Sequence, residues 1–475
     1  MNGQPSIIFE NKNRISSEDS MEASFQAKHE RPFREVFNEF GDTTTFHGLR
    51  YVTNNSNHYF RRLIWTVVVL AMTTWLIVNI IDALIIMNKH EQTSTISINY
   101  VTDMKFPAVT LCNYNQFRNG LLSEEAIATL GLVYSTSPTR LINRDVDLTP
   151  LQDEFDNYNG GTIDFIKNLS HQIEDMVEDC SWRSRPCSHL NFTQHVLDHG
   201  VCYTFNNPVD EDDILTVKNP GSRNGLYLRL NIQHDLYTFG ENTGAGIKVA
   251  LHPQGTLPII KELAFSLAPG FETLVAVREK VINSLPTPFR DNCTNTNFTD
   301  YPFKYSVPAC NFLCKVRYVI EQCGCRDYRW PAGPEPICSV EDQVYCIYKN
   351  EGEFYERGIS CDCPICCTTR QYDSQTSQAY WPNANLLATY NLSEQEVRRN
   401  YLDVYIFFEE IMYTMVTQSE AYTLANLQGD VGGYMGLLCG MSLITLFEWA
   451  DFVLLSLLKR FREPRRPMSS ENPAL

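Results

Sequence analysis

Two long apolar runs stand near the ends of the 475-residue chain, and the residues between them are far more polar. The first run covers residues 63–87 and the second covers residues 431–458. Each exceeds the roughly 20 residues that a helix needs to cross the hydrocarbon core of a bilayer. The pattern predicts two membrane spans, at 63–87 and 429–458, separated by a large domain of residues 88–428.

Basic residues predict the orientation of the two spans. Loops rich in Lys and Arg stay in the cytoplasm, which places the N-terminal region 1–62 and the tail 459–475 inside and residues 88–428 outside the cell. A cleaved signal peptide is not expected, because the first run begins after a long polar region and exceeds the usual apolar length of about 7–15 residues. The flanking basic residues are Arg50, Arg61, Arg62, Lys459, Arg460, Arg462, Arg465 and Arg466.

Alternating apolar and polar residues predict half-buried strands at 225–232, 247–251 and 402–408. Apolar residues at helical spacing predict one amphipathic helix over 163–177. The outer domain is therefore expected to be α+β, and movement of its last strand would pull on the second span that follows. Residues 1–45 lack sustained periodicity, so we expect a disordered cytoplasmic arm.

All but one of the sixteen cysteines lie in the segment assigned outside, and eleven of them fall between Cys293 and Cys367. The run from Cys361 to Cys367 also has the short spacing of zinc ligands. Disulfides are the favoured interpretation, because extracellular thiols oxidise, and no metal is expected. An odd number of outer cysteines leaves one over, and Cys366 is the suspected free or intermolecular thiol.

Composition supports the extracellular assignment and excludes one function class. A net charge of −17 argues against nucleic-acid binding. Glycosylation sequons fall in the outer segment. They are Asn168, Asn191, Asn292, Asn297 and Asn391.

Glu448 and Asp451 are the charges inside the second span. Such charges are costly in lipid, by about 2.5–3.5 kcal/mol each, and usually face water or a bundle interior. Their i, i+3 spacing puts both on one helical face, where a symmetric oligomer would form acidic rings that attract cations. Helix pairing or snorkelling is the alternative. For Asp82, near the outer end of the first span, reaching the interface is the favoured reading.

Glycines recur at three- and four-residue spacing along the second span. One explanation is tight helix packing. The other is that the helix breaks at Gly440-Met441-Ser442 and turns backbone carbonyls into a pore, and periodicity does not choose between them. The glycines are Gly429, Gly432, Gly433, Gly436 and Gly440.

Four motifs, in order and with fitting spacing, resemble the degenerin/epithelial sodium channel family, especially its acid-sensing and neuropeptide-gated members. The resemblance extends from about Gly48 to Phe461. The motifs are His47-Gly48, FPAVTLC at 106–112, CYTF at 202–205 and GDVGG at 429–433.

The resemblance implies a homo- or heterotrimer around one central pore, with outer domains built from palm, finger, knuckle and a cysteine-rich thumb at about 293–367. It also implies which cysteines form disulfides, with Cys366 unpaired. The implied disulfides are Cys112 with Cys202, Cys180 with Cys187, Cys293 with Cys367, Cys310 with Cys363, Cys314 with Cys361, Cys323 with Cys346, and Cys325 with Cys338.

The resemblance further implies roles for individual residues. His47 and Gly48 would take part in gating, Asn426 would occupy the degenerin gating position, and Asp430 would lie near the outer mouth. Gly440-Met441-Ser442 would occupy the position that determines ion selectivity. The family usually has a small residue where Met441 stands, so the choice between sodium and calcium stays open.

Residues that serve acid sensing in the family are largely absent. The acidic pair of the finger corresponds here to Asp235-Leu236, and the thumb acids fall on Tyr348 and Gly352. Paired histidines after the first span are also lacking, with His90 the one nearby. Direct proton gating therefore loses support.

The resulting hypothesis is a plasma-membrane, ligand-gated, amiloride-sensitive, sodium-permeable cation channel subunit that needs no cofactor and is opened by a short amidated neuropeptide. Alternatives within the channel class are gating by protons, mechanical gating, constitutive opening, and an auxiliary role in hetero-oligomers. From other classes, an adhesion receptor or a membrane-anchored enzyme is the alternative. Neither accounts for acidic residues at membrane depth, and no nucleophile motif or metal triad is evident.

Overall fold

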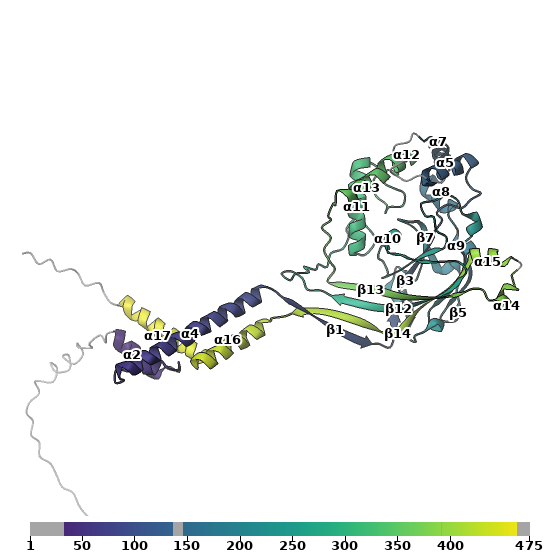
Figure 1. Ribbon diagram of the computed structural model, residues 1–475. Helices are drawn as coiled ribbons and strands as arrows, with labels where there is room; N and C mark the ends of the chain where they lie inside the picture. Colours follow the sequence, from purple (N-terminus) through teal and green to yellow (C-terminus); the bar gives the residue numbers. More distant parts are fainter. Residues whose placement is uncertain (1–32, 136–145, 391, 463–475) are drawn as a thin grey trace, which may run out of the picture. The chain divides into compact units, whose positions relative to one another are not determined.

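The computed structural model describes residues 33–135, 146–390 and 392–462 (Figure 1). These residues form two compact units. The central unit comprises Gln92–Glu420. The terminal unit combines the chain up to Glu91 with the chain from Ala421.

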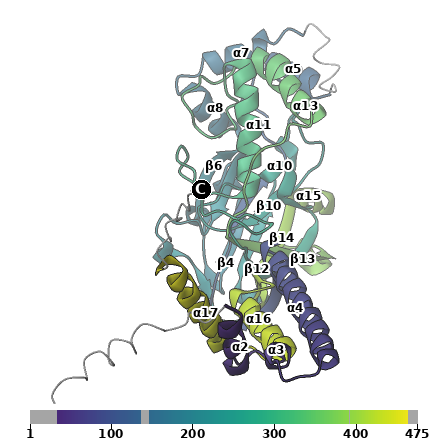
Figure 2. The ribbon, with the colours of Figure 1, turned by 90° about the vertical axis from the view of Figure 1, so that its left-hand side faces the viewer.

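The terminal unit is helical. Helices α4 and α16 lie side by side (Figures 1 and 2), joined by packing of Leu76 against Met435 and Cys439. Among the described residues, α4 is long and apolar enough to cross a membrane, and the bent pair α16 and α17 passes the same test when taken as one span. The helices are α2 (Phe33–Thr43), α3 (Leu49–Thr53), α4 (Tyr59–Asn88), α16 (Leu424–Cys439) and α17 (Leu443–Arg462).

The prediction of a disordered arm over residues 1–45 is wrong for residues 33–43, which form helix α2. Phe33, Phe37 and Phe40 recur every three or four residues and form one apolar face. Their rings pack against Phe452 of α17. This long-range contact supplies the burial that residues 33–43 lack on their own, while residues 1–32 of the arm lie outside the described chain.

A seven-stranded sheet dominates the central unit. Strands follow the order β13-β12-β14-β9-β4-β5, and β1 pairs with the far half of β14. Two predicted strands, 225–232 and 402–408, are confirmed as β9 and the start of the much longer β14. The strands are β1 (Gln92–Tyr100), β4 (Val177–Trp182), β5 (Arg185–Pro186), β9 (Leu226–Asn231), β12 (Phe271–Asn283), β13 (Thr368–Tyr380) and β14 (Tyr401–Glu420).

A second sheet has five strands in the order β11-β10-β3-β7-β6. The predicted strand at 247–251 is confirmed as β10, but it is buried along nearly its whole length rather than half-buried. The main core includes Phe106, Leu228 and Phe408. The strands are β3 (Ala108–Asn113), β6 (Phe192–Leu197), β7 (Gly200–Phe205), β10 (Ile247–His252) and β11 (Phe265–Leu267), with a separate pair β2 (Met104–Lys105) and β8 (Thr216–Val217).

The predicted helix over 163–177 is wrong in its second half. Helix α8 ends at Leu169, the extended backbone of Ser170 interrupts it, and only a short helix, α9, follows. Val177 already begins β4, which pairs with β9. Pairing with a neighbouring strand therefore overrides a helical apolar pattern. The helices on this side are α5 (Glu124–Ser135), α7 (Thr149–Asp156), α8 (Gly161–Leu169) and α9 (Ile173–Met176).

The cysteine-rich segment, residues 293–367, is built on the long helix α11. Ser306 accepts a hydrogen bond from the N–H of Ala309 at the start of α11, and Gly324 ends the helix with a φ of 71°. Its elements are α11 (Val307–Cys323), α12 (Val340–Asp342), the π-helical turn η5 (Gln343–Ile347) and α13 (Tyr348–Glu356). Elsewhere lie α10 (Ile260–Leu263), α14 (Ala384–Leu387), α15 (Glu394–Asn400), η1 (His189–Asn191), η2 (Glu211–Asp213), η3 (Ser222–Asn224) and η4 (His234–Leu236).

Seven disulfides staple the central unit, and they are the seven pairs implied by the family resemblance. Five of them lie in the cysteine-rich segment, whose own apolar core is small. Cys366 and Cys439 are the two free thiols. The pairs are Cys112–Cys202, Cys180–Cys187, Cys293–Cys367, Cys310–Cys363, Cys314–Cys361, Cys323–Cys346 and Cys325–Cys338.

Replacing Cys325 by serine is expected to reduce the amount of protein at the cell surface severalfold. Loss of a native disulfide costs about 2–5 kcal/mol in small stapled domains, which is enough to expose the protein to quality control. Surface biotinylation measures the effect. Cys366→Ser is the control, because Cys366 forms no disulfide, and equal surface levels of the two variants would contradict the prediction.

Candidate pore and gating site

The second apolar run is divided at residues 440–442. Gly440 adopts the left-handed conformation, with φ 60° and ψ 23°, and the helices on either side are bent by 75°. The N–H groups of Gly440 and Met441 donate to the carbonyls of Gly436 and Met435 at 3.0 and 3.1 Å. Glycine at this position is a common helix terminator because it tolerates positive φ.

The break bears on the two explanations for the glycines of the second span. Of the two explanations, packing or interruption, the structure favours interruption at Gly440-Met441-Ser442. A Cβ atom on any of the other four glycines would touch nothing in the described chain outside its own helix. These four glycines are Gly429, Gly432, Gly433 and Gly436.

His47 and Gly48 lie against this break, although they come from the opposite end of the sequence. The N–H of His47 donates to the carbonyl of Cys439 at 3.0 Å, and a Cβ on Gly440 would collide with the His47 ring. Gly48 has a φ of 91°, and a Cβ there would lie 2.8 Å from the side chain of Val69. The two motifs singled out for gating and selectivity are thus in direct contact.

Glu448 is bound by the N-terminal segment rather than left free. Its carboxylate accepts hydrogen bonds from the Thr44 hydroxyl at 2.9 Å and from the Thr45 N–H at 3.0 Å. The Thr45 and Thr445 hydroxyls are 2.5 Å apart. Asp451 is exposed, and no hydrogen bond or ion pair joins it to another described residue. Lining of a pore by either carboxylate stays a prediction, as does an interfacial position for the exposed Asp82.

Asp451→Asn is expected to raise the calcium concentration for half block of the current several-fold. A ring of carboxylates attracts divalent cations, and Asp451 is freer than Glu448 to do so. Glu448→Gln is expected to have the smaller effect, because threonine donors already engage that side chain.

Calcium titration of whole-cell currents provides the measurement for both pore variants. Asp373→Asn, an exposed carboxylate on β13, controls for loss of one charge. Unchanged calcium behaviour in both pore variants would count against a pore-lining role.

An aromatic cluster fastens α2 to α17. The Phe40 ring lies 4.5 Å from that of Phe452 and 5.0 Å from that of Trp449, centroid to centroid. Together with the threonine contacts to Glu448, this cluster joins the N-terminal segment to the second half of the broken span. Sequence reasoning missed it, although the spacing of Phe33, Phe37 and Phe40 was a usable signal.

Asn426 and Asp430 lie in the first two turns of α16. Thr423 caps the helix by accepting from the Asn426 N–H at 3.2 Å, and its hydroxyl donates to the Asn426 side chain at 3.0 Å. Asp430 accepts from the Tyr422 hydroxyl at 2.6 Å. That hydrogen bond raises the pKa of Tyr422 to about 12. Both predicted gating residues therefore bind the segment between β14 and α16.

The positions that correspond to acid-sensing residues do not form a carboxyl pair. Asp235 forms an ion pair with Arg399 and accepts from the Asn400 amide at 2.8 Å. Burial raises the pKa of Tyr348 well above its usual value. Gly352 lies on α13. The family's acidic pair is replaced by an acid with cationic and amide partners.

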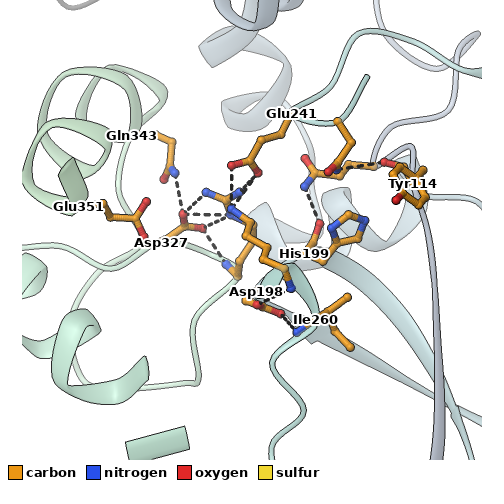
Figure 3. A network of polar contacts seen from close by, with 12 residues as sticks. Tyr114, Asp198, His199, Glu241, Ile260, Asp327, Gln343 and Glu351 are labelled. Atoms are coloured by element: carbon orange, nitrogen blue, oxygen red, sulfur yellow. Dashed lines mark hydrogen bonds and ion pairs between the residues drawn. The ribbon is translucent and has the colours of Figure 1, made fainter. Parts of the chain in front are cut away.

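A polar network, buried at Asp198, Asp327 and Arg329, instead joins the cysteine-rich segment to the rest of the central unit (Figure 3). Arg329, 4% exposed, binds both carboxylate oxygens of Asp327 and donates to Glu241 at 2.9 Å. Lys261 also donates to Glu241, at 2.8 Å. Asp198 accepts from the backbone N–H of Lys261 at 3.0 Å. Hydrogen bonds and ion pairs thus join four segments that are distant in sequence, those of Asp198, Glu241, Lys261 and Arg329.

The cations of this network keep its acids ionised. Burial opposes the charge on Asp327 and on Glu241, but the neighbouring Arg329 guanidinium outweighs it and holds the pKa of both below the usual value. Asp198 differs, since burial raises its pKa despite two backbone hydrogen bonds. Sequence reasoning did not identify this network, whose only local signal is the Asp327-Tyr328-Arg329 triplet.

The sequons and the odd cysteine are accessible to different degrees. Asn168, Asn191, Asn292 and Asn297 are exposed, and Asn391 lies outside the described residues. Glycosylation stays a prediction at all five. Cys366 is half-buried, and burial raises the pKa of its thiol, which favours the unreactive protonated form.

Comparison with known proteins identifies the family. A profile described as "Amiloride-sensitive sodium channel" matches residues 40–452. Acid-sensing ion channel 2 of Rattus norvegicus is 31% identical over 87% of this chain and 85% of its own length. Acid-sensing ion channel 1C of Danio rerio is 32% identical, over 90% and 87%. Acid-sensing ion channel 1 of Gallus gallus is 31% identical, over 87% and 82%.

A solved structure of a proton-activated chloride channel aligns with a TM-score of 0.32 at 8% identity, covering 84% of this chain and 98% of that one, which is too distant to bear on the fold. The profile match includes both His47 and the break at residues 440–442. The matched relatives are membrane ion channels. The chain therefore belongs to the amiloride-sensitive sodium channel family.

Proposed function

We propose that the chain is one subunit of a trimeric, sodium-permeable cation channel of the plasma membrane, opened by an extracellular peptide. Both termini are cytoplasmic in this proposal, and residues 440–442 form the constriction. The supporting observation is the interrupted second span with His47 against it. Irregular backbone at membrane depth is tolerated only where it is buried in protein or lines a water-filled cavity.

The connections between helices and strands support gating from outside. Helix α4 ends at Asn88 and β1 begins at Gln92, while β14 ends at Glu420 and α16 begins at Leu424. Strands β1 and β14 pair with each other over nine residues. Both spans are thus tied by three-residue links to one ladder, so a shift of that ladder would act on both. A ligand opens such a channel only if it binds the open state more tightly.

A peptide is favoured over protons because most buried titratable groups are unsuited to sensing mild acid. Burial lowers the pKa of His171, His199 and His252 to about 4, so they stay neutral at physiological pH. Asp327 and Glu241 have pKa values below the usual range. These groups would all keep their charge states during moderate acidification.

Proton gating is the second candidate, and two carboxyls favour it. Burial raises the pKa of Glu279 on β12, whose partner is Arg370 at 2.5 Å. Burial likewise raises the pKa of Asp198. A carboxyl with a raised pKa gains its proton at a higher pH than usual, so protonation during acidification would neutralise it. The named relatives are acid-sensing channels.

Whole-cell recording from the chain expressed alone tests the proposal. Acid is applied first and then a panel of amidated neuropeptides, with amiloride as blocker. A peptide-evoked, amiloride-sensitive inward current is the expected result. A current evoked by acid alone would overturn peptide gating in favour of protons, and Glu279→Gln and Asp198→Asn would then locate the sensor. Silence with protein at the surface would indicate an auxiliary subunit that needs partners.

A further inference from the structure

A pocket of about 340 Å³ lies on the seven-stranded sheet, where β13, β12, β14 and β9 are neighbours. We call it the sheet pocket. None of the residues labelled in Figure 3 lines it. The residues that matter for its chemistry are Arg229, Glu272, Tyr380, Trp381, Asp403 and Tyr405.

Strand register places a row of charges across the sheet at this pocket. Glu272 is opposite Asp403, Asp403 is opposite Arg229, and Arg229 is opposite Asp179. Residues directly opposite each other share one face of a sheet. The row therefore contains three carboxylates and one guanidinium, and adjacent like charges such as Glu272 and Asp403 are unfavourable without a further cation.

Arg229 forms a bidentate ion pair with Asp403. Its Nε and Nη2 atoms each lie 2.9 Å from a different oxygen of the Asp403 carboxylate, a bidentate arrangement, and Asp403 is 2% exposed. The guanidinium also lies 5.0 Å from the centre of the Trp381 ring. This pair is neutral overall, so it offers no net positive charge to Glu272.

Glu272 is the acid without a counter-ion. Its side chain is half-buried and makes no hydrogen bond or ion pair with any residue that the structure describes. Aromatic rings stand around it. Tyr380, Trp381 and Tyr405 line the same pocket. The Tyr380 side chain is 80% exposed, and the Arg398 guanidinium lies 5.8 Å from the centre of its ring. Ring faces attract cations, and a half-buried carboxylate strengthens that preference.

We propose that the sheet pocket binds the guanidinium of an arginine side chain carried by the extracellular peptide. The identity of the carrier rests on the proposed peptide gating, whereas the choice of an organic cation rests on the pocket itself. Its volume is near the lower limit of small-molecule sites, so it holds one side chain rather than a whole peptide. An anionic ligand would be repelled by Glu272.

Binding of L-argininamide to the purified full-length protein in detergent, measured by titration calorimetry, tests the assignment. Glu272→Gln is expected to weaken binding roughly tenfold or more, because a charge-assisted hydrogen bond is lost. Tyr380→Ala, at an exposed ring, is expected to weaken it roughly two- to fivefold. Glu410→Gln removes an exposed acid of β14 outside the pocket and is expected to change nothing.

Two results would overturn the assignment, namely no binding by the unmodified protein or equal affinity of Glu272→Gln and Glu410→Gln. Light scattering of the same samples measures the oligomeric state and so tests whether a second copy of the chain fills the pocket instead. If Glu272→Gln dissociates the oligomer and argininamide does not bind, a second copy of the chain fills the pocket and the proposal fails. Binding without a peptide-evoked current would uphold the pocket and reject peptide gating, so the two proposals fail separately.

Discussion

Replacing Gly440 by alanine is expected to reduce the current at least about tenfold while leaving the protein at the cell surface. Gly440 has a φ of 60°, and a Cβ there would collide with the His47 ring. A left-handed conformation costs an L-residue roughly 1–2 kcal/mol, before the collision is counted. The break would have to move or the His47 contact would have to open. Current density normalised to surface biotinylation measures the loss.

Gly436→Ala is the matched control for this prediction. Gly436 is one turn earlier on the same helix, and an added Cβ there touches nothing outside α16. Alanine also has a higher helix propensity than glycine. We expect this variant to conduct like the unmodified channel. If Gly440→Ala and Gly436→Ala carried equal currents, the contact between His47 and the break would have no part in conduction.

Arg329→Leu is expected to destabilise the central unit by about 3–5 kcal/mol, because it leaves the buried Asp327 carboxylate without its cation. Asp327 is fully buried and depends on Arg329 for its charge-assisted hydrogen bonds, whereas Glu241 keeps Lys261. The loss is large relative to the stability of most domains. A lower melting temperature of the purified protein and reduced surface expression are the expected readouts.

Arg357→Leu removes an equally close ion pair in a different environment. Arg357 lies 2.6 Å from Glu353, but its side chain is 63% exposed, and surface pairs contribute about 0–1 kcal/mol. A small change in melting temperature is therefore expected. If the two leucine variants melted alike, burial would not be what makes the Arg329 network important. Adding Asp327→Leu to Arg329→Leu is expected to recover part of the loss.

Local sequence patterns predicted the elements whose signals are strong and short in range. Period-two alternation located β9, β10 and the start of β14. Long apolar runs located α4 and the region of α16 and α17. The family resemblance, rather than spacing, supplied the cysteine pairing, because many connectivities are compatible with one cysteine pattern.

Predictions were wrong where distant contacts decide the local conformation. Residues 33–43 have too little apolar surface to fold alone, and they are helical because Trp449 and Phe452 pack against them. Residues 173–177 have helical spacing, yet Val177 joins a strand because β9 offers a pairing edge. Neither partner is visible within the local sequence window.

The sequence by itself determined the two apolar runs, the cysteine-rich segment and the family, since these depend on composition, length and ordered motifs. Tertiary structure decided which groups meet. It bent the second run at Gly440 and placed His47 beside it. It bound Glu448 to threonines, and within the described ranges it left Glu272 without an ion-pair partner beside the Asp403–Arg229 pair. Charge and hydrogen bonding act over a few ångströms, and only the folded chain brings such distant residues that close.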